Sequence, residues 1–203
     1  MGSELQRLYG NIDIYLLDQL LKGTYDNCEK VLDAGCGGGR NLIHFLRNGL
    51  DVYGIDIDPS AVSAVVQLSR TLVPENAKEN FLNASVENLP FGDNYFDLII
   101  SSAVLHFAKS PDHFDSMIHS MWRVLKSGGY LFARIASDIG IETLVHSQGN
   151  GRYLLPDGSE RFLVNQQMLL QYTDRLNGRL HEPIKTTNVQ NLRCMTTWCL
   201  QKI

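Results

Sequence analysis

Short runs rich in β-branched and aromatic residues alternate with amphipathic helical patterns along most of the chain. Within each helical pattern the apolar residues recur at three- and four-residue steps, as at Phe114, Met117, Ile118 and Met121. This alternation is typical of a parallel sheet that helices cover on both faces. The sequence therefore predicts an α/β fold.

The pattern also places the individual elements along the chain. Strands are expected at residues 30–33, 52–56, 79–83, 96–101 and 130–135, with two closing strands at 184–189 and 194–201. Helices are expected at residues 12–22, 40–47, 58–70, 111–126 and 165–176. Residues 1–28 form an N-terminal helical cap in this scheme. Residues 138–161 are polar and contain glycine, which predicts a lid or a substrate loop.

Composition narrows the class of protein. The 203 residues include 18 Lys and Arg against 22 Asp and Glu, which gives a net charge of −4, and 44% are hydrophobic. These values predict one soluble globular domain over residues 1–203. No apolar run approaches the roughly 20 residues that cross a bilayer, and the basic footprint of a duplex-binding protein is missing. We therefore expect no membrane and no nucleic-acid partner.

The cysteines give information about redox compartment and metal content. Cys28, Cys36, Cys194 and Cys199 include no Cys-x-x-Cys spacing, so neither a zinc site nor a disulfide framework is indicated. Free thiols are typical of a reducing environment. The sequence thus predicts a cytoplasmic protein with no bound metal, as a monomer or a homodimer.

A glycine cluster follows the first expected strand. In the run from Asp33 to Gly39, Gly35, Gly37 and Gly39 surround Cys36 at the turn into a helix. Such a turn needs glycine where a ligand must approach the backbone closely. Asp56 ends the second strand about 20 residues later, where a carboxylate can accept hydrogen bonds from a ribose diol. A cofactor that contains a nucleoside is therefore expected.

The spacing of the glycines decides between cofactors. A nicotinamide fingerprint, Gly-x-Gly-x-x-Gly, would need glycine at Arg40 or Leu42. The segment Asp33-Ala34-Gly35-Cys36-Gly37-Gly38-Gly39 instead closely resembles the first motif of class I S-adenosylmethionine-dependent methyltransferases. The resemblance implies S-adenosyl-L-methionine as cofactor and S-adenosyl-L-homocysteine as product. It also implies a Rossmann-like three-layer sandwich whose mostly parallel seven-stranded sheet has an antiparallel last strand.

Further motifs of that family follow in the expected order. The family's second motif is similar to Gly54-Ile55-Asp56. The signature of its small-molecule branch is similar to Leu89-Pro90-Phe91 followed by Phe96-Asp97. A later turn of the family is similar to Leu125-Lys126-Ser127-Gly128-Gly129. By resemblance, Asp56 holds the ribose, Ile57 lies beside the adenine, and Ser85 and the Val86 N–H contact the adenine. The segment from Ser101 to His106 lines the methionine and the methyl group. Asp58 precedes Pro59 and is expected to cap a helix.

Methyl transfer mainly requires that the acceptor atom, the methyl group and the sulfur be held in line. Holding reactants in this way can lower the activation barrier by roughly 7 to 11 kcal/mol. His106 is the titratable residue that the motif places near the methyl group, either as a general base or as a packing residue that moves no proton. Tyr9 and Arg152 are expected to contact the acceptor, with Arg152 meeting any anionic group. Arg134, Arg161 and Arg193 are further candidates for an anionic substrate.

The function predicted from these residues is methyl transfer to a small-molecule acceptor, whose accepting atom the sequence leaves open. Three alternatives remain at this stage. One is a nicotinamide-dependent oxidoreductase, which the residue at Arg40 disfavours. Another is a catalytically idle module that binds the cofactor. The third is a methyltransferase acting on RNA or protein, for which a basic face is expected and is not evident.

Overall fold

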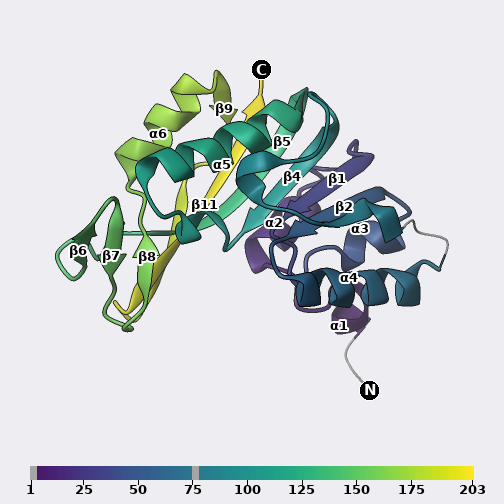
Figure 1. Cartoon of the computed structure of the whole chain (residues 1–203), viewed down its shortest axis with the longest axis horizontal. Coiled ribbons are helices and arrows are strands. Elements are labelled where there is room, and N and C mark those ends of the chain that lie inside the picture. The colour runs from purple at the N-terminus through teal and green to yellow at the C-terminus, as the bar shows by residue number, and fades with distance from the viewer. Residues whose placement is uncertain (1–3, 75–77) are drawn as a thin grey trace.

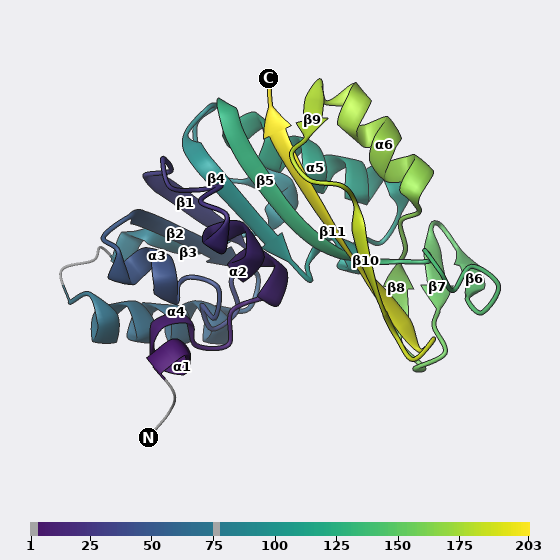
Figure 2. The same ribbon diagram turned by 180° about the vertical axis from the view of Figure 1, so that it is seen from behind.

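The computed structural model describes residues 4–74 and 78–203. Within that part, eight strands form one sheet in the order β10-β11-β5-β4-β1-β2-β3, with β9 beside β11 (Figures 1 and 2). The strands are β1 Lys30–Ala34, β2 Asp51–Asp56, β3 Phe81–Asn83, β4 Phe96–Ser102, β5 Leu125–Ser137, β9 Gly178–Leu180, β10 Lys185–Val189 and β11 Arg193–Lys202. Strands β1 to β5 pair in parallel, and β11 is antiparallel to β5, β9 and β10. The mostly parallel sheet with an antiparallel last strand is therefore confirmed.

Helices cover both faces of the sheet, so the molecule has three layers. One face carries α2 (Ile14–Leu21), α3 (Ile43–Arg47) and α4 (Pro59–Leu72), which bury Leu16, Phe45 and Val65 in one core cluster. The other face carries α5 (Pro111–Val124) and α6 (Gln166–Arg175), which bury Phe114 and Leu169 in a second cluster. Figure 1 shows α5 in front of the sheet. Figure 2 shows the molecule from the opposite side, with α2 and α3 on the face toward the viewer.

Side-chain caps fix where several helices begin. Asp58 accepts the N–H of Ser60 at 2.9 Å, and Pro59 occupies the first turn of α4, as the sequence predicts. Asn165 accepts the N–H of Met168 at 2.8 Å at the start of α6. Because such caps are local in sequence, these helix starts are confirmed close to their predicted positions.

The helix predicted over residues 111–126 ends two residues early. α5 stops at Val124, and Leu125 already pairs in β5. The Nζ of Lys202 donates to the carbonyl oxygens of Trp122 and Leu125, at 2.8 and 2.7 Å, where a helix end leaves carbonyls unpaired. The partner that closes this helix end is therefore distant in sequence.

Residues 138–161, for which a lid or a substrate loop is predicted, contain regular structure. Strands β6 (His146–Gly149), β7 (Arg152–Leu154) and β8 (Glu160–Phe162) form a separate antiparallel sheet, the small sheet. Its inner residue Phe162 is 1% exposed and stacks on Phe114 of α5, with ring centroids 5.1 Å apart. The small sheet is therefore anchored on the core, at the end of the molecule away from α3 and α4 (Figure 1).

Other boundaries differ from the prediction by a few residues. The helix expected from residue 40 begins at Ile43, and the strand expected over 79–83 is a 3-10 turn followed by β3. The sheet has eight strands rather than seven because β9 adds a short pairing to β11. In the predicted cap over residues 1–28, whose first three residues lie outside the described part, α1 (Glu4–Tyr9) precedes α2. In the ranges 4–74 and 78–203, no helix is both long and apolar enough to cross a bilayer.

Candidate functional site

The strand order reverses between β1 and β4, since β2 lies on one side of β1 and β4 on the other. In open parallel sheets, ligands bind beyond the carboxyl ends of the strands at such a reversal. Two cavities lie there, of about 400 and about 520 Å³, and Ala103 lines both. The smaller one, here called the loop cavity, is lined by residues that include Gly35, Asp56, Ile57, Ala84, Val86 and Val104. The larger one, here called the arginine cavity, is lined by residues that include Asp13, Arg40, Ser102, His106, Arg134, Asp157, Arg161, Arg193 and Met195.

The glycine loop reaches the loop cavity through Gly35. Gly35, Gly37 and Gly39 have φ angles of +90, +50 and +81°. A Cβ on Gly35 would lie 2.3 Å from Cγ2 of Val104, and one on Gly39 would lie 2.7 Å from Cγ2 of Val65. A Cβ on Gly37 would meet no atom of the described residues within 4 Å. Packing within the protein therefore requires Gly35 and Gly39, whereas Gly37 leaves room for a ligand near its backbone.

Cys36 contributes to this loop through its backbone. Its N–H donates to the carbonyl oxygen of Ile55 at 2.9 Å, and its side chain is 4% exposed. The Sγ lies 3.0 Å from where a Cβ on Gly54 would stand, so the thiol packs against β2. Burial raises the pKa of this thiol, which keeps it protonated at neutral pH.

Asp56 connects the glycine loop to the end of β2. Its Oδ2 accepts the N–H of Gly37 and its Oδ1 accepts the N–H of Asp58, each at 2.9 Å. The carboxylate lines the loop cavity, while Asp58 caps α4. Ile57, between them, is 74% exposed at the rim of the same cavity. Asp56 is therefore the aspartate that faces the loop cavity, and Asp58 is the one that caps α4.

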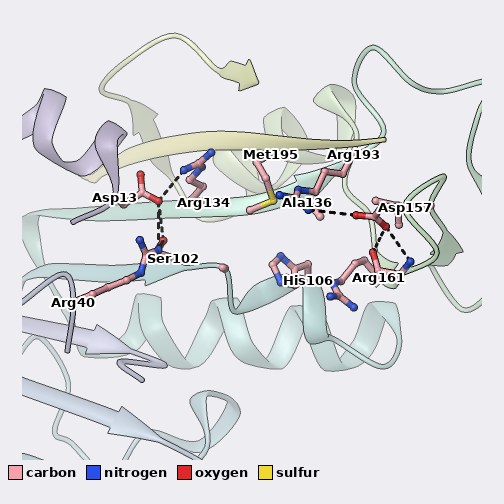
Figure 3. A pocket seen from close by; sticks show the side chains of 13 residues that line it. Asp13, Arg40, Ser102, His106, Arg134, Ala136, Asp157, Arg161, Arg193 and Met195 are labelled. Atoms are coloured by element: carbon pink, nitrogen blue, oxygen red, sulfur yellow. Dashed lines mark hydrogen bonds and ion pairs between the residues drawn. The ribbon is translucent and has the colours of Figure 1, made fainter. Parts of the chain in front are cut away.

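One end of the arginine cavity is organised by Asp13, which is 2% exposed and immediately precedes α2 (Figure 3). Its Oδ2 accepts hydrogen bonds from Ser102 Oγ and Arg134 Nη1, both at 3.0 Å. Arg40 donates to Ser102 Oγ at 3.1 Å and lies 3.7 Å from the same carboxylate oxygen. This cluster joins the N-terminal segment to the ends of β4 and β5.

The opposite end of the arginine cavity comes from the small sheet and β11. Asp157 and Arg161 flank Arg193 there, and His106 and Met195 lie between the two ends in Figure 3. Arg193 Nη1 is 3.5 Å from Asp157 Oδ2. The cavity therefore has polar groups at both ends.

The family described as "Methyltransferase domain" matches residues 32–133, half of the chain, from β1 into β5. The chain belongs to this methyltransferase family. This membership decides against the nicotinamide alternative, and S-adenosyl-L-methionine is the cofactor of the family.

Curated relatives cover parts of the chain. An uncharacterized methyltransferase of Synechocystis is 36% identical over 107 residues, 53% of this chain and 46% of that protein. A tRNA U34 carboxymethyltransferase of Hydrogenovibrio crunogenus is 34% identical over 171 residues, 82% of this chain and 46% of that protein. The chain therefore spans about half the length of these relatives.

Solved structures share the fold over almost the whole chain. A Pyrococcus horikoshii protein has a TM-score of 0.72 at 18% identity and covers all of both chains. A Burkholderia thailandensis 1,6-didemethyltoxoflavin-N1-methyltransferase, solved with S-adenosylhomocysteine, has a TM-score of 0.64 at 17% identity, covering 91% of this chain and 76% of that one. The Rossmann-like fold of the methyltransferases is thus confirmed.

The buried carboxyl of Asp33 bears on whether the residues of this site fit the cofactor. The side chain is 1% exposed, and neither carboxyl oxygen accepts a hydrogen bond from the described part of the chain. Burial raises its pKa to about 7, although nearby Arg40 acts in the opposite direction. A buried carboxyl without partners favours a cationic group nearby, and the cofactor carries an ammonium. With the open backbone at Gly37, the residues present fit the cofactor.

The family resemblance implies that Val86, Ser85 and Ser101 contact the cofactor, and these three residues differ in their burial and in whether they line a cavity. Val86 is 5% exposed and lines the loop cavity. Ser85 precedes the 3-10 turn Val86–Asn88 and is half-buried, and its side chain makes no cap hydrogen bond to that turn. Ser101 is fully buried, and its Oγ is without a hydrogen-bond partner among residues 4–74 and 78–203. The hydroxyl that reaches a cavity from the end of β4 belongs to Ser102.

His106 lies in the wall of the arginine cavity and is 6% exposed. Burial, with a smaller contribution from the charge of Arg161, lowers its pKa to about 4. The ring is therefore neutral at pH 7, and within the described chain its Nδ1 has no hydrogen-bond partner. A neutral imidazole of this kind can accept a hydrogen bond or a proton from a ligand.

The two residues predicted to contact the acceptor lie elsewhere. Tyr9 stacks on His44 of α3 with ring centroids 5.5 Å apart. In the described part of the chain, it lines neither of the two cavities. Arg152 donates to Glu160 Oε1 at 2.6 Å and to the carbonyl oxygen of Ala108 at 3.0 Å, which ties the small sheet to the chain before α5. Arg161 is the arginine of the small sheet that reaches the arginine cavity.

Asp13 is a central residue of the arginine cavity that the sequence did not indicate. Its partners Ser102 and Arg134 follow about 90 and 120 residues later in the chain. The only local signal is its position before a helix, where it accepts the N–H of Tyr15 at 3.0 Å.

Proposed function

We propose that the chain transfers a methyl group from S-adenosyl-L-methionine to a small molecule bound in the arginine cavity. The observation that carries this proposal is that Ala103 lines both cavities. A ligand in each cavity therefore meets the other at the end of β4. A volume of about 520 Å³ is in the range of pockets that hold small molecules.

The residues around the loop cavity have distinct roles in this proposal. Asp56 binds the ribose hydroxyls, the N–H of Val86 and the Ser85 hydroxyl serve the adenine edge, and Ile57 covers the adenine ring from the rim. Asp33 lies below the glycine loop and stabilises the ammonium. When bound, the cofactor supplies a methyl group that is already activated on a sulfonium.

The chain itself contributes orientation and a place for a proton. Ala103, at φ +64°, holds a backbone conformation that is uncommon for residues other than glycine and forms the boundary of both cavities. His106 is the group that accepts the proton of an acceptor O–H or N–H, and as a weak base it contributes toward the lower end of the roughly 10² to 10⁴-fold that general bases typically supply. Because its pKa is about 4, this base is available throughout the neutral pH range.

The experiment has two parts. Calorimetry with S-adenosylhomocysteine should give a dissociation constant in the micromolar range, about −8 kcal/mol. Incubation with methyl-labelled cofactor and a panel of metabolites, read by mass spectrometry, should then give a methylated product. Failure of the folded protein to bind the cofactor at millimolar concentration would contradict the proposal. Binding without transfer to any metabolite would favour an idle cofactor-binding module.

A second candidate acceptor is RNA. The 34% identical relative from Hydrogenovibrio crunogenus is named a tRNA U34 carboxymethyltransferase, and a second relative of that name is 32% identical over 129 residues. A net charge of −4 argues against a broad RNA-binding face. Transfer of label to bulk tRNA, with none to metabolites, would establish this alternative.

A further inference from the structure

The arginine cavity is positively charged in a chain whose net charge is negative. Its lining includes four arginines, Arg40, Arg134, Arg161 and Arg193, and two aspartates, Asp13 and Asp157. The lining therefore carries a formal charge of +2 while the chain carries −4. A cavity with walls of low dielectric focuses such a charge on whatever enters it.

Three of the four guanidinium groups lie beside carboxylates. Arg134 and Arg40 lie 3.0 and 3.7 Å from Asp13 Oδ2. Arg193 lies 3.5 Å from Asp157 Oδ2, so Arg40 has the longest separation of the three pairs and Arg134 the shortest. These pairs account for both aspartates of the lining.

Arg161 is the positive charge that remains. Its Nη1 donates to the carbonyl oxygen of Glu160 at 2.8 Å, and its guanidinium carbon lies 5.2 Å from the ring centroid of Phe107. Among the ion pairs formed within the described ranges, none includes Arg161. The Phe107 ring and a backbone carbonyl thus hold the guanidinium at the cavity without neutralising it.

His106 provides a second, independent observation. Its imidazole lies in the cavity wall between Arg161 and the Asp13 end (Figure 3), is more than nine-tenths buried, and has an unpartnered Nδ1 in the described structure. A buried polar atom left unpaired costs roughly as much as a lost hydrogen bond, so it indicates a missing ligand group. A ligand group in the cavity beside His106 would supply that partner, and Arg161 lines the same cavity.

The rest of the lining shows what the body of such a ligand is like. Ala136, Leu155 and Met195 add apolar surface to the lining. About 520 Å³ is far more than an inorganic anion needs. An organic molecule with an anionic group at one end and a less polar body satisfies both features.

We propose that the acceptor is a small organic anion whose carboxylate or phosphate binds the guanidinium of Arg161, with Arg193 beside it, and whose body passes His106 toward Ala103. Identifying this ligand as the acceptor rests on the proposed function, but the anion site does not. Arg161 presents several N–H groups in a plane, which matches both oxyanions.

The test uses three probes on the full chain at fixed ionic strength, with and without S-adenosylhomocysteine. Benzoate carries a carboxylate, phenyl phosphate carries a phosphate, and benzamide is a neutral molecule of nearly the same shape as benzoate. Binding is followed by NMR. We expect at least one of the two anions to bind about tenfold more tightly than benzamide, as expected for a hydrogen bond to a charged group. The tighter anion identifies the group that the site prefers.

Variants connect the binding to Arg161. Arg161→Gln should weaken binding of the preferred anion about tenfold, and Arg161→Lys should restore part of it. Arg70→Gln, on the exposed surface of α4, is the matched control and should change nothing. Thermal unfolding of each variant shows whether the fold is retained. Equal binding of benzamide and the anions, unchanged binding in Arg161→Gln, or no binding of either anion at millimolar concentration would overturn the proposal.

The two proposals can fail separately. If the anion binds through Arg161 but S-adenosylhomocysteine does not bind, the anion site stands and methyl transfer is excluded. If labelled methyl groups reach only neutral metabolites, and Arg161→Gln does not change that transfer, methyl transfer stands and the organic anion is wrong.

Discussion

The carboxyl of Asp33 is buried without a hydrogen-bond partner from the described chain, so its placement is costly in the free protein. Its pKa is about 7 because of burial, whereas an unfolded aspartate has a pKa of about 4. The folded chain therefore holds an extra proton between these two values, and the free energy of unfolding should fall as pH rises from about 4 to 7.

Asp33→Asn removes this ionisation without changing the shape of the side chain. Each pKa unit is worth about 1.4 kcal/mol, so we expect the stability advantage of the variant over the parent to be larger at pH 8 than at pH 5 by on the order of 3 kcal/mol. Urea denaturation at the two pH values measures this difference. The same variant should bind S-adenosylhomocysteine more weakly, because the partner of its ammonium is lost. An advantage of the same size at the two pH values would contradict this account of Asp33.

Asp13 shows what a second buried carboxylate does when it has partners. Replacing it in Asp13→Ala leaves the guanidinium of Arg134 and the hydroxyl of Ser102 unpaired and removes the cap of α2. We expect a loss of about 3 to 5 kcal/mol in the free energy of unfolding, measured by chemical denaturation. Asn165→Ala removes a helix cap alone and should lose only about 1 kcal/mol. Similar losses in the two variants would mean that Asp13 acts only as a cap.

These two residues show how far the sequence could predict the site. Asp33 and Asp56 were predicted because each lies at a fixed distance in sequence from the glycine loop. Asp13 was not, since Ser102 and Arg134 come beside it only when the ends of β4 and β5 meet the segment before α2. Contacts of that kind follow from the sheet order and leave no local pattern.

At the level of elements, the same distinction separates what was predicted from what was not. The starts of α4 and α6 were predicted because Asp58 and Asn165 cap them locally. The end of α5 was not, because Lys202 closes it from the other end of the chain. The individual strands of the small sheet were not predicted, because β6 is exposed along its whole length and so has no alternation of polar and apolar residues.

The attachment of the small sheet to the core can be tested at two glycines. Gly151 and Gly158 both have positive φ, +73 and +81°. A Cβ on Gly151 would lie 2.3 Å from Cε2 of Phe162, whereas one on Gly158 would meet nothing within 4 Å in the part of the chain described. Only the first substitution therefore disturbs packing.

Alanine at each position should separate backbone strain from packing. Gly158→Ala should lower the free energy of unfolding by about 1 kcal/mol, the cost of a left-handed residue with a side chain. Gly151→Ala should cost about 1 to 3 kcal/mol more because Phe162 cannot move freely against Phe114. It should also speed hydrogen exchange in β7 and β8, next to Arg161. Equal losses and equal exchange in the two variants would show that the small sheet does not depend on Phe162.

For the whole molecule, the sheet order is what brings the two cavities together. β1 and β4 are neighbours although more than 60 residues separate them, and β11 returns beside β5 to bring Arg193 and Met195 to the arginine cavity. Ligands in either cavity therefore bind only the folded chain, and their binding free energy adds to global stability.

This linkage gives a test of the loop cavity through global unfolding. At S-adenosylhomocysteine concentrations about 100 times its dissociation constant, the free energy of unfolding should rise by about 2.7 kcal/mol. For a chain of this length, that corresponds to a rise of roughly 5 to 10 °C in the Tm. At the same concentration, Asp56→Ala should lose most of the ligand-dependent rise, because its carboxylate is proposed to hold the ribose.

Asp58→Ala is the matched control for that measurement. It removes a neighbouring aspartate and the cap of α4, so the Tm of the free protein should fall. The rise that the ligand produces should nevertheless remain, because Asp58 is committed to the helix and does not line the loop cavity in the described chain. Comparing the ligand-dependent increase in Tm, rather than the Tm itself, removes the loss of stability that either substitution causes in the free protein. For Asp56→Ala that loss includes the hydrogen bonds that the N–H groups of Gly37 and Asp58 donate to Asp56. If Asp58→Ala lost the rise and Asp56→Ala kept it, the ribose would have to be assigned to Asp58.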